Sequence, residues 1–284
     1  MIIIKPIHER LLIQLASYKF LTISQFAKLG VGHPSKIKTG LQDLREQGLI
    51  RHAQYSAVIK KKGSSERIHF LKPKGAKILL ESRLELLTSE IKYPKSTNSL
   101  FRNDYFHRIS TINSQISCIQ WLNDNNCRLS FFDRYFDKTG SQRSQDTTGL
   151  LSGVTRLLFS DGTHIEPDAI FGYRNGQDKP YLYILEVFNG NDTKRVVQQL
   201  TKASQAIIEG LAGDKYHMPV ATRLLATFEN ESNMKAVIER LSQDENFQFD
   251  GIDKFFFFAL AETIKEDFGV WLNLKGQGVN LLEL

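Results

Sequence analysis

The chain has 284 residues, of which 41% are hydrophobic and 24% are charged. These values are typical of a folded protein and exclude wholesale disorder, and the length suits two domains that each bury a core. Charge is unevenly distributed: Lys plus Arg outnumber Asp plus Glu by 18 to 7 in residues 1–95, whereas residues 96–284 hold 19 against 24. The sequence therefore predicts a basic N-terminal domain, 1–95, and a mildly acidic C-terminal domain, 96–284.

We expect no targeting or membrane segment in the first residues. Met1 to Ile4 are apolar, but charged residues follow from Lys5, and the longest later apolar run is only Phe255 to Ala261. We therefore expect a cytoplasmic protein with no membrane insertion. Cys118 and Cys127 lack the spacing of a metal site and the number of a disulfide framework, so we expect both in the core.

Residues 1–95 show helical apolar spacing first and strand patterns afterwards. The predicted elements are helices over Ile7 to Tyr18, Leu21 to Leu29 and Pro34 to Gln47, strands over Arg51 to Ile59 and Arg67 to Leu71, and a helix over Lys74 to Leu87. Pro34 favours a helix start, and the turn at Gly30 to His33 separates the second helix from the third. Lys60, Lys61 and Lys62 stand at the polar tip between the strands.

This order resembles a winged helix-turn-helix domain. The resemblance implies that Pro34 to Gln47 lies in the major groove of double-stranded DNA while the lysine-rich wing contacts the backbone. The residues that it implies for DNA contact are Ser35, Lys36, Lys38, Gln42, Arg45, Lys60, Lys61 and Lys62. Gln42 or Arg45 could read base edges and the others could meet phosphates. The alternative is a winged helix that contacts proteins.

Residues 96–284 alternate helices and strands, which predicts an α/β (α+β) domain with a mixed sheet. The predicted elements are a helix over Phe101 to Leu122, strands over Arg128 to Tyr135, Val154 to Phe159, Ile165 to Tyr173 and Pro180 to Phe188, a helix over Thr193 to Gly210, a strand over Val220 to Phe228, a helix over Ser232 to Leu241 and a strand over Lys254 to Leu260. Asp161-Gly162 and Asn175-Gly176 mark tight turns.

Two acids fall on neighbouring predicted strands of this domain. Asp168 follows Pro167, and Glu186 lies near the end of the next strand. Two carboxylates suffice to anchor Mg²⁺ or Mn²⁺, which keep several water ligands. Alternation along one continuous strand would place Glu166 on the face of Asp168 as a third carboxylate, together with His164. His107, on the preceding helix, could approach the same region.

The helix residues Phe106-His107-Arg108, the pair Pro167-Asp168 and the segment Leu185-Glu186-Val187 resemble a PD-(D/E)XK nuclease, the restriction-endonuclease-like fold. Together with the winged helix, they resemble the replication-relaxation family, which includes MobC-type relaxases of mobilizable plasmids. The resemblance implies a metal-dependent endonuclease that nicks DNA at a transfer or replication origin. It also implies relaxosome or transfer proteins as partners.

Phe188 departs from the nuclease pattern, which has a lysine two residues after the second acid. Lys194, Arg195 or Lys202 could supply the missing positive charge from the following helix, and Gln198 or Gln199 could orient a phosphate. Two functions therefore remain open. The first is a nicking enzyme with Asp168, Glu186, Lys194, Lys202, Glu166 and His107 as candidate catalytic residues. The second is a catalytically inactive, origin-binding accessory factor or transcriptional regulator.

Overall fold

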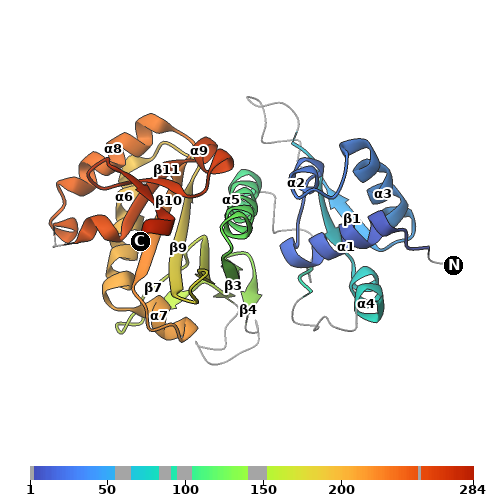
Figure 1. Ribbon diagram of the computed structural model, residues 1–284, viewed down its shortest axis with the longest axis horizontal. Coiled ribbons are helices and arrows are strands. Elements are labelled where there is room, and N and C mark those ends of the chain that lie inside the picture. The colour runs from blue at the N-terminus through green and yellow to red at the C-terminus, as the bar shows by residue number, and fades with distance from the viewer. Residues whose placement is uncertain (1–2, 55–64, 83–90, 95–103, 140–151, 249–250) are drawn as a thin grey trace. The chain divides into compact units, whose positions relative to one another are not determined.

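The computed structural model describes residues 3–54, 65–82, 91–94, 104–139, 152–248 and 251–284. The chain divides into two compact units, Met1–Tyr105 and Phe106–Leu284 (Figure 1). None of the described helices is long and apolar enough to cross a membrane. The assignment of residues 1–95 to DNA binding and of 96–284 to a nuclease-like domain stays a prediction.

The first unit contains the predicted helix-turn-helix followed by a strand pair. Its described elements are α1 (Pro6–Tyr18), α2 (Ile23–Lys28), α3 (Pro34–Glu46), β1 (Ile50–Ala53), β2 (Ile68–Leu71) and α4 (Pro73–Ser82). Thr22 caps α2, because its hydroxyl accepts the backbone N–H of Gln25 while the Gln25 side chain accepts that of Thr22. Pro34 is the first residue of α3, as predicted. The face that α3 buries consists of Ile37, Gly40, Leu41 and Leu44.

Strands β1 and β2 pair antiparallel, with His52 opposite His69. Leu21 adds an isolated antiparallel bridge to His69, so the segment before α2 joins the edge of this small sheet. The first strand was predicted to run to Ile59, but β1 ends at Ala53. Residues 55–64 lie outside the described part of the chain, so the basic tip with its three lysines stays a prediction.

The second unit is built on a mixed seven-stranded sheet of order β13-β12-β11-β10-β9-β8-β3. The described elements are α5 (Tyr105–Asp124), β3 (Arg128–Arg134), β4 (Lys138–Thr139), β5 (Ser152–Gly153), β6 (Leu157–Leu158), β7 (His164–Ile165), β8 (Ala169–Arg174), β9 (Pro180–Phe188), α6 (Thr193–Ile208), α7 (Leu211–Tyr216), β10 (Thr222–Phe228), α8 (Glu231–Ser242), η3 (Glu245–Phe247), η4 (Ile252–Lys254), β11 (Phe256–Leu260), α9 (Ala261–Glu266), β12 (Val270–Asn273), β13 (Gly278–Asn280) and η5 (Leu281–Glu283). Strand β10 is parallel to β9 and β11, and the remaining neighbours in this sheet pair antiparallel. The predicted mixed α/β architecture is confirmed.

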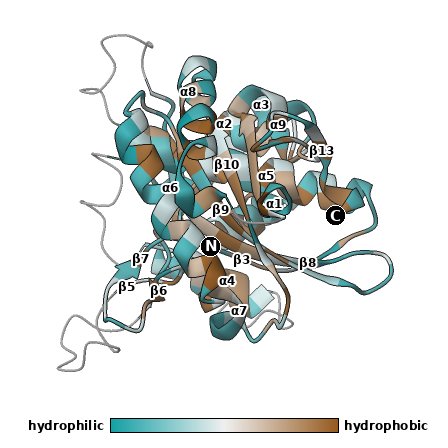
Figure 2. Ribbon diagram, turned by 90° about the vertical axis from the view of Figure 1, so that its left-hand side faces the viewer, coloured by the Kyte–Doolittle hydropathy of each residue, from teal (hydrophilic) through white to brown (hydrophobic). Residues whose placement is uncertain are grey.

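The two faces of this sheet pack against different helices. Leu182 and Phe188 on β9 belong to a core shared with α6 and α8, whereas Tyr183 and Val187 belong to one shared with α5. Figure 2 shows the largely hydrophobic colouring of β9 and β10 that burial on both faces requires. Glu186 has the parity of Leu182 and Phe188, so it projects toward α6 from within an apolar strand.

The predicted strand from Ile165 to Tyr173 is wrong as a continuous element. It is divided into β7, which ends at Ile165, and β8, which begins at Ala169. Pro167 lies in the break, and proline cannot donate a ladder hydrogen bond. The expected common face of His164, Glu166 and Asp168 is therefore also wrong, because alternation does not carry across the break. Strands β12 and β13 were not predicted.

Candidate functional site

Asp168 and Glu186 lie side by side at the ends of two neighbouring strands. The β8–β9 register pairs Ala169 with Leu185, and continuing it by one residue places Asp168 opposite Glu186. Both residues are buried, with 6% and 2% of their surface exposed. The two acids, which the sequence places on neighbouring predicted strands, thus lie opposite each other in the fold.

Hydrogen bonds fix both carboxyl groups. His107 Nε2 lies 2.6 Å from Asp168 Oδ1, and the Val187 backbone N–H donates to Asp168 Oδ2 over 2.7 Å. Gln199, on α6, donates from Nε2 to Glu186 Oε2 over 2.8 Å. Asp168 is therefore attached to α5 through His107, while Glu186 is attached to α6 through Gln199. The pair connects the helices on the two faces of the sheet.

Glu186 is electrostatically unusual. Burial, and after it the neighbouring Asp168 carboxylate, raise the pKa of the Glu186 carboxyl well above its usual range, and the hydrogen bond from Gln199 offsets this only in part. Glu186 consequently keeps its proton at a pH where an ordinary glutamate has lost it. Two adjacent buried carboxylates would repel each other, so a proton or a cation between them stabilises the pair.

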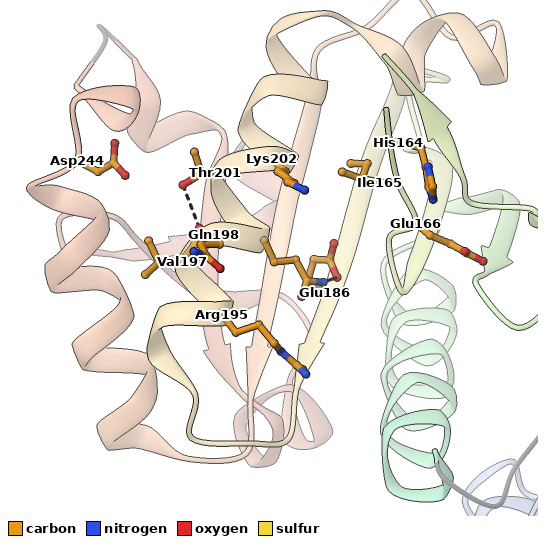
Figure 3. Close-up of a pocket in the computed structure, with 11 residues that line it drawn as sticks. His164, Ile165, Glu166, Glu186, Arg195, Val197, Gln198, Thr201, Lys202 and Asp244 are labelled. Atoms are coloured by element: carbon orange, nitrogen blue, oxygen red, sulfur yellow. Dashed lines mark hydrogen bonds between the residues drawn. The ribbon is translucent and has the colours of Figure 1, made fainter. Parts of the chain in front are cut away.

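A cavity of about 820 Å³ opens beside Glu186. Figure 3 shows Arg195 and Lys202, from α6, on one side of the Glu186 carboxyl, and His164 and Glu166 on the other. Arg195 and Lys202 are exposed, and neither forms an ion pair with a described residue. The cavity therefore combines a buried acid at its base with two available cations on its wall.

The remaining candidates, Glu166 and Lys194, form no hydrogen bond with the pair, whose carboxyl groups bond to His107, Val187 and Gln199 among the described residues. Glu166 forms an ion pair with Lys138 over 2.8 Å, and its side chain is 31% exposed, so it is directed to β4 rather than to Asp168. Lys194 is exposed near the start of α6 and does not line the cavity. Phe188 is buried, with its ring 5.1 Å from that of Phe228. The position at which the nuclease pattern has a lysine is thus part of the core.

The donor set suits only a metal ion that keeps much of its water. Among the described residues, no group of three or more His, Cys, Asp or Glu side chains is placed to hold a metal ion. Mg²⁺ is commonly bound through one or two carboxylates and several waters, and carboxylates also suit Mn²⁺. Asp168 and Glu186 fit this pattern, because a cation between them would take the place of the proton that Glu186 keeps.

Helix α3 presents most of its predicted DNA-contacting residues to solvent. Ser35, Lys36, Lys38 and Gln42 are exposed. Arg45 is half-buried, and its Nη1 donates to His52 Nδ1 over 3.2 Å. The sequence did not single out His52, seven positions after Arg45, as its partner.

Comparisons with known proteins do not establish a family for this chain. No protein-family model matches, and no curated protein matches. Among solved structures, Bacillus subtilis PadR in complex with operator DNA aligns with 19% sequence identity and a TM-score of 0.24, over 42% of this chain and 68% of PadR. At this TM-score the likeness establishes neither a shared fold nor a shared function.

Proposed function

We propose that this chain binds double-stranded DNA and nicks one strand with a divalent metal ion, as a relaxase at a transfer or replication origin does. The observation that carries the proposal is the buried pair Asp168 and Glu186 beside a cavity with two cations that form no ion pair with a described residue. Burying two adjacent carboxyl groups is costly unless they hold a proton or a cation, and such sites concentrate at functional centres.

Each side chain has a role that its surroundings support. Asp168 and Glu186 hold the metal ion, and His107 fixes the orientation of Asp168 as partners of metal ligands commonly do. When bound, the ion supplies charge neutralisation at the phosphate and lowers the pKa of the attacking water. Arg195 and Lys202 face the same cavity and stabilise the phosphate, in place of the lysine that Phe188 replaces.

The first unit supplies the DNA contacts in this proposal. Residues 1–95 carry a net charge of +11 from 18 basic and 7 acidic residues, and counterion release on phosphate binding makes such a surface suited to DNA. The exposed residues Lys36, Lys38 and Gln42 on α3 are available to phosphates and base edges. Relaxosome or transfer proteins belong to the same proposal as further partners.

A second function is favoured by Phe188. This buried phenylalanine stands where the nuclease pattern has a lysine. Gln199 also donates a hydrogen bond to one oxygen of Glu186. Under this alternative, the chain is an inactive, origin-binding accessory factor or a transcriptional regulator, and the second unit serves assembly.

Incubation of supercoiled, origin-containing plasmid with Mn²⁺ distinguishes the two functions. We expect wild-type protein to convert the plasmid to the open-circular form, and Asp168→Asn to lose this conversion because the metal loses a ligand. Glu166→Gln is the matched control, since it removes a nearby carboxylate that pairs with Lys138. Nicking that survives in Asp168→Asn would refute the assigned site. DNA binding without nicking would support the accessory factor.

The predicted wing is tested separately by replacing Lys60, Lys61 and Lys62 with alanine. We expect weaker DNA binding and a shallower dependence of log affinity on log salt, by about 0.9 for each phosphate contact that is lost. An unchanged slope would remove the wing from the DNA interface.

A further inference from the structure

Two arginines of the first unit bond to residues on one face of the β1–β2 hairpin. Arg45, in the last turn of α3, donates to His52 Nδ1 over 3.2 Å. Arg67 precedes β2, and its Nε donates to Gln54 Oε1 over 3.1 Å. His52 pairs with His69 in the hairpin register. Gln54 lies two residues after His52, and Arg67 lies two residues before His69. Continuing the antiparallel register therefore places Gln54 opposite Arg67, on the hairpin face of His52.

Both arginines also act electrostatically on His52. Burial, then Arg45, then Arg67 lower the pKa of His52. Burial, then His52 and the same two arginines lower the pKa of His69 to about 4. The histidines are therefore neutral at physiological pH, and they bring no positive charge of their own.

Neither arginine pairs with an acid in the described part of the chain. Arg45 donates to the His52 imidazole and Arg67 to the Gln54 amide, and no carboxylate of a described residue pairs with either guanidinium. Each guanidinium carries five N–H donors, so most of its donors remain available. Two neighbouring positive charges held by neutral groups are suited to an anion that bonds to both.

We infer that Arg45 and Arg67 together bind one backbone phosphate of DNA, and that His52 and Gln54 hold the two guanidinium groups in place. The inference rests on the proposed DNA-binding function and deepens it. It assigns Arg45 to a phosphate instead of a base edge, and it adds Arg67, which the sequence pattern did not single out. Such a contact fixes the position of α3 on the duplex without reading its sequence.

The test measures binding of the full chain to fluorescent mixed-sequence duplex DNA by anisotropy over a range of salt. Neutralising one phosphate contributes about 0.9 to the slope of log affinity against log salt. We expect the double variant Arg45→Gln/Arg67→Gln to lose about this much. Raising salt from about 50 to about 200 mM should then weaken wild type about 3.5-fold more than the double variant.

Three comparisons make the result specific. Arg51→Gln removes a charge from the opposite face of β1 and should leave the slope unchanged. Arg45→Lys/Arg67→Lys keeps both charges, so it should keep the slope while losing affinity, and thermal melting checks that each variant is folded. The ratio of affinities for AT-rich and GC-rich duplexes should be the same in Arg45→Gln as in wild type.

Several results would overturn the inference. An unchanged slope in the double glutamine variant would exclude a shared phosphate. A decrease of the slope by about 1.8 would exclude it too, because it means two separate phosphate contacts. So would an equal decrease of the slope in Arg51→Gln. A changed ratio between the duplexes in Arg45→Gln assigns Arg45 to base reading. If wild type binds neither duplex, the proposed DNA-binding function fails together with the inference. If wild type binds DNA but the slope results above are found, only the shared phosphate contact fails.

Discussion

Replacing Glu186 with glutamine should stabilise the metal-free protein at neutral pH. Glutamine has nearly the same volume, its carbonyl oxygen can still accept from Gln199, and its amide can donate to Asp168. The substitution therefore keeps the contacts and replaces a proton that titrates with an amide that does not. Glu186 is only 2% exposed, so the substitution hardly changes the surface of the folded protein.

The expected pH dependence follows from the raised pKa of Glu186. In the unfolded chain this carboxyl titrates near 4.5, whereas in the folded protein it keeps its proton to a higher pH. As pH rises between the two pKa values, the unfolded state releases a proton that the folded state retains, so the free energy of unfolding of wild type falls. One proton limits this fall to about 1.4 kcal/mol per pH unit.

Urea unfolding in EDTA measures the effect. At a pH below about 4 the two proteins should differ little, and between about pH 5 and about pH 6 the variant should gain up to about 1.4 kcal/mol over wild type. Glu166→Gln serves as the control, because it loses only a partly exposed ion pair with Lys138, worth about 0–1 kcal/mol. A stability difference between Glu186→Gln and wild type that is flat or falls with pH would refute the account of this buried pair.

Three other substitutions test the surroundings of the site and the core. Arg134 is fully buried and bonds to Asp137, so Arg134→Met should cost about 3–5 kcal/mol of unfolding free energy in urea, and a loss below about 1 kcal/mol would contradict this. His107→Ala should weaken Mn²⁺ binding about 10–100-fold by freeing the Asp168 carboxylate, and unchanged affinity by calorimetry would exclude this role. Gly75→Ala should lower thermal stability by about 1–3 kcal/mol, because a Cβ there meets the backbone of Leu49, and a neutral effect would show that this contact relaxes.

Local signals in the sequence predicted much of the fold. Pro34 predicted the start of α3, because its fixed backbone angle suits the first position of a helix. Asp161-Gly162 predicted the turn between β6 and β7, and Gly162 has a φ of 82°. Such signals act within a few residues, so they can be read before any packing is known.

Contacts between distant residues could not be predicted in the same way. The spacing of Glu166 and Asp168 in the sequence suggested a shared strand face. The strand is interrupted at Pro167, however, and Glu166 forms an ion pair with Lys138. His107 reaches Asp168 across 61 positions in the sequence, and Gln199 rather than a lysine bonds to Glu186. These partners depend on strand register and on which helix face packs against the sheet.

The central claim is that Asp168 and Glu186 together hold a divalent metal ion. Electron paramagnetic resonance of free Mn²⁺ during titration with the full-length chain tests this most directly, because the bound ion is lost from the free signal. We predict saturable binding of a single Mn²⁺ by wild type, and its loss in Asp168→Asn and in Glu186→Gln while both variants remain folded. Binding that is undiminished in these variants, or no binding by wild type, would contradict the claim.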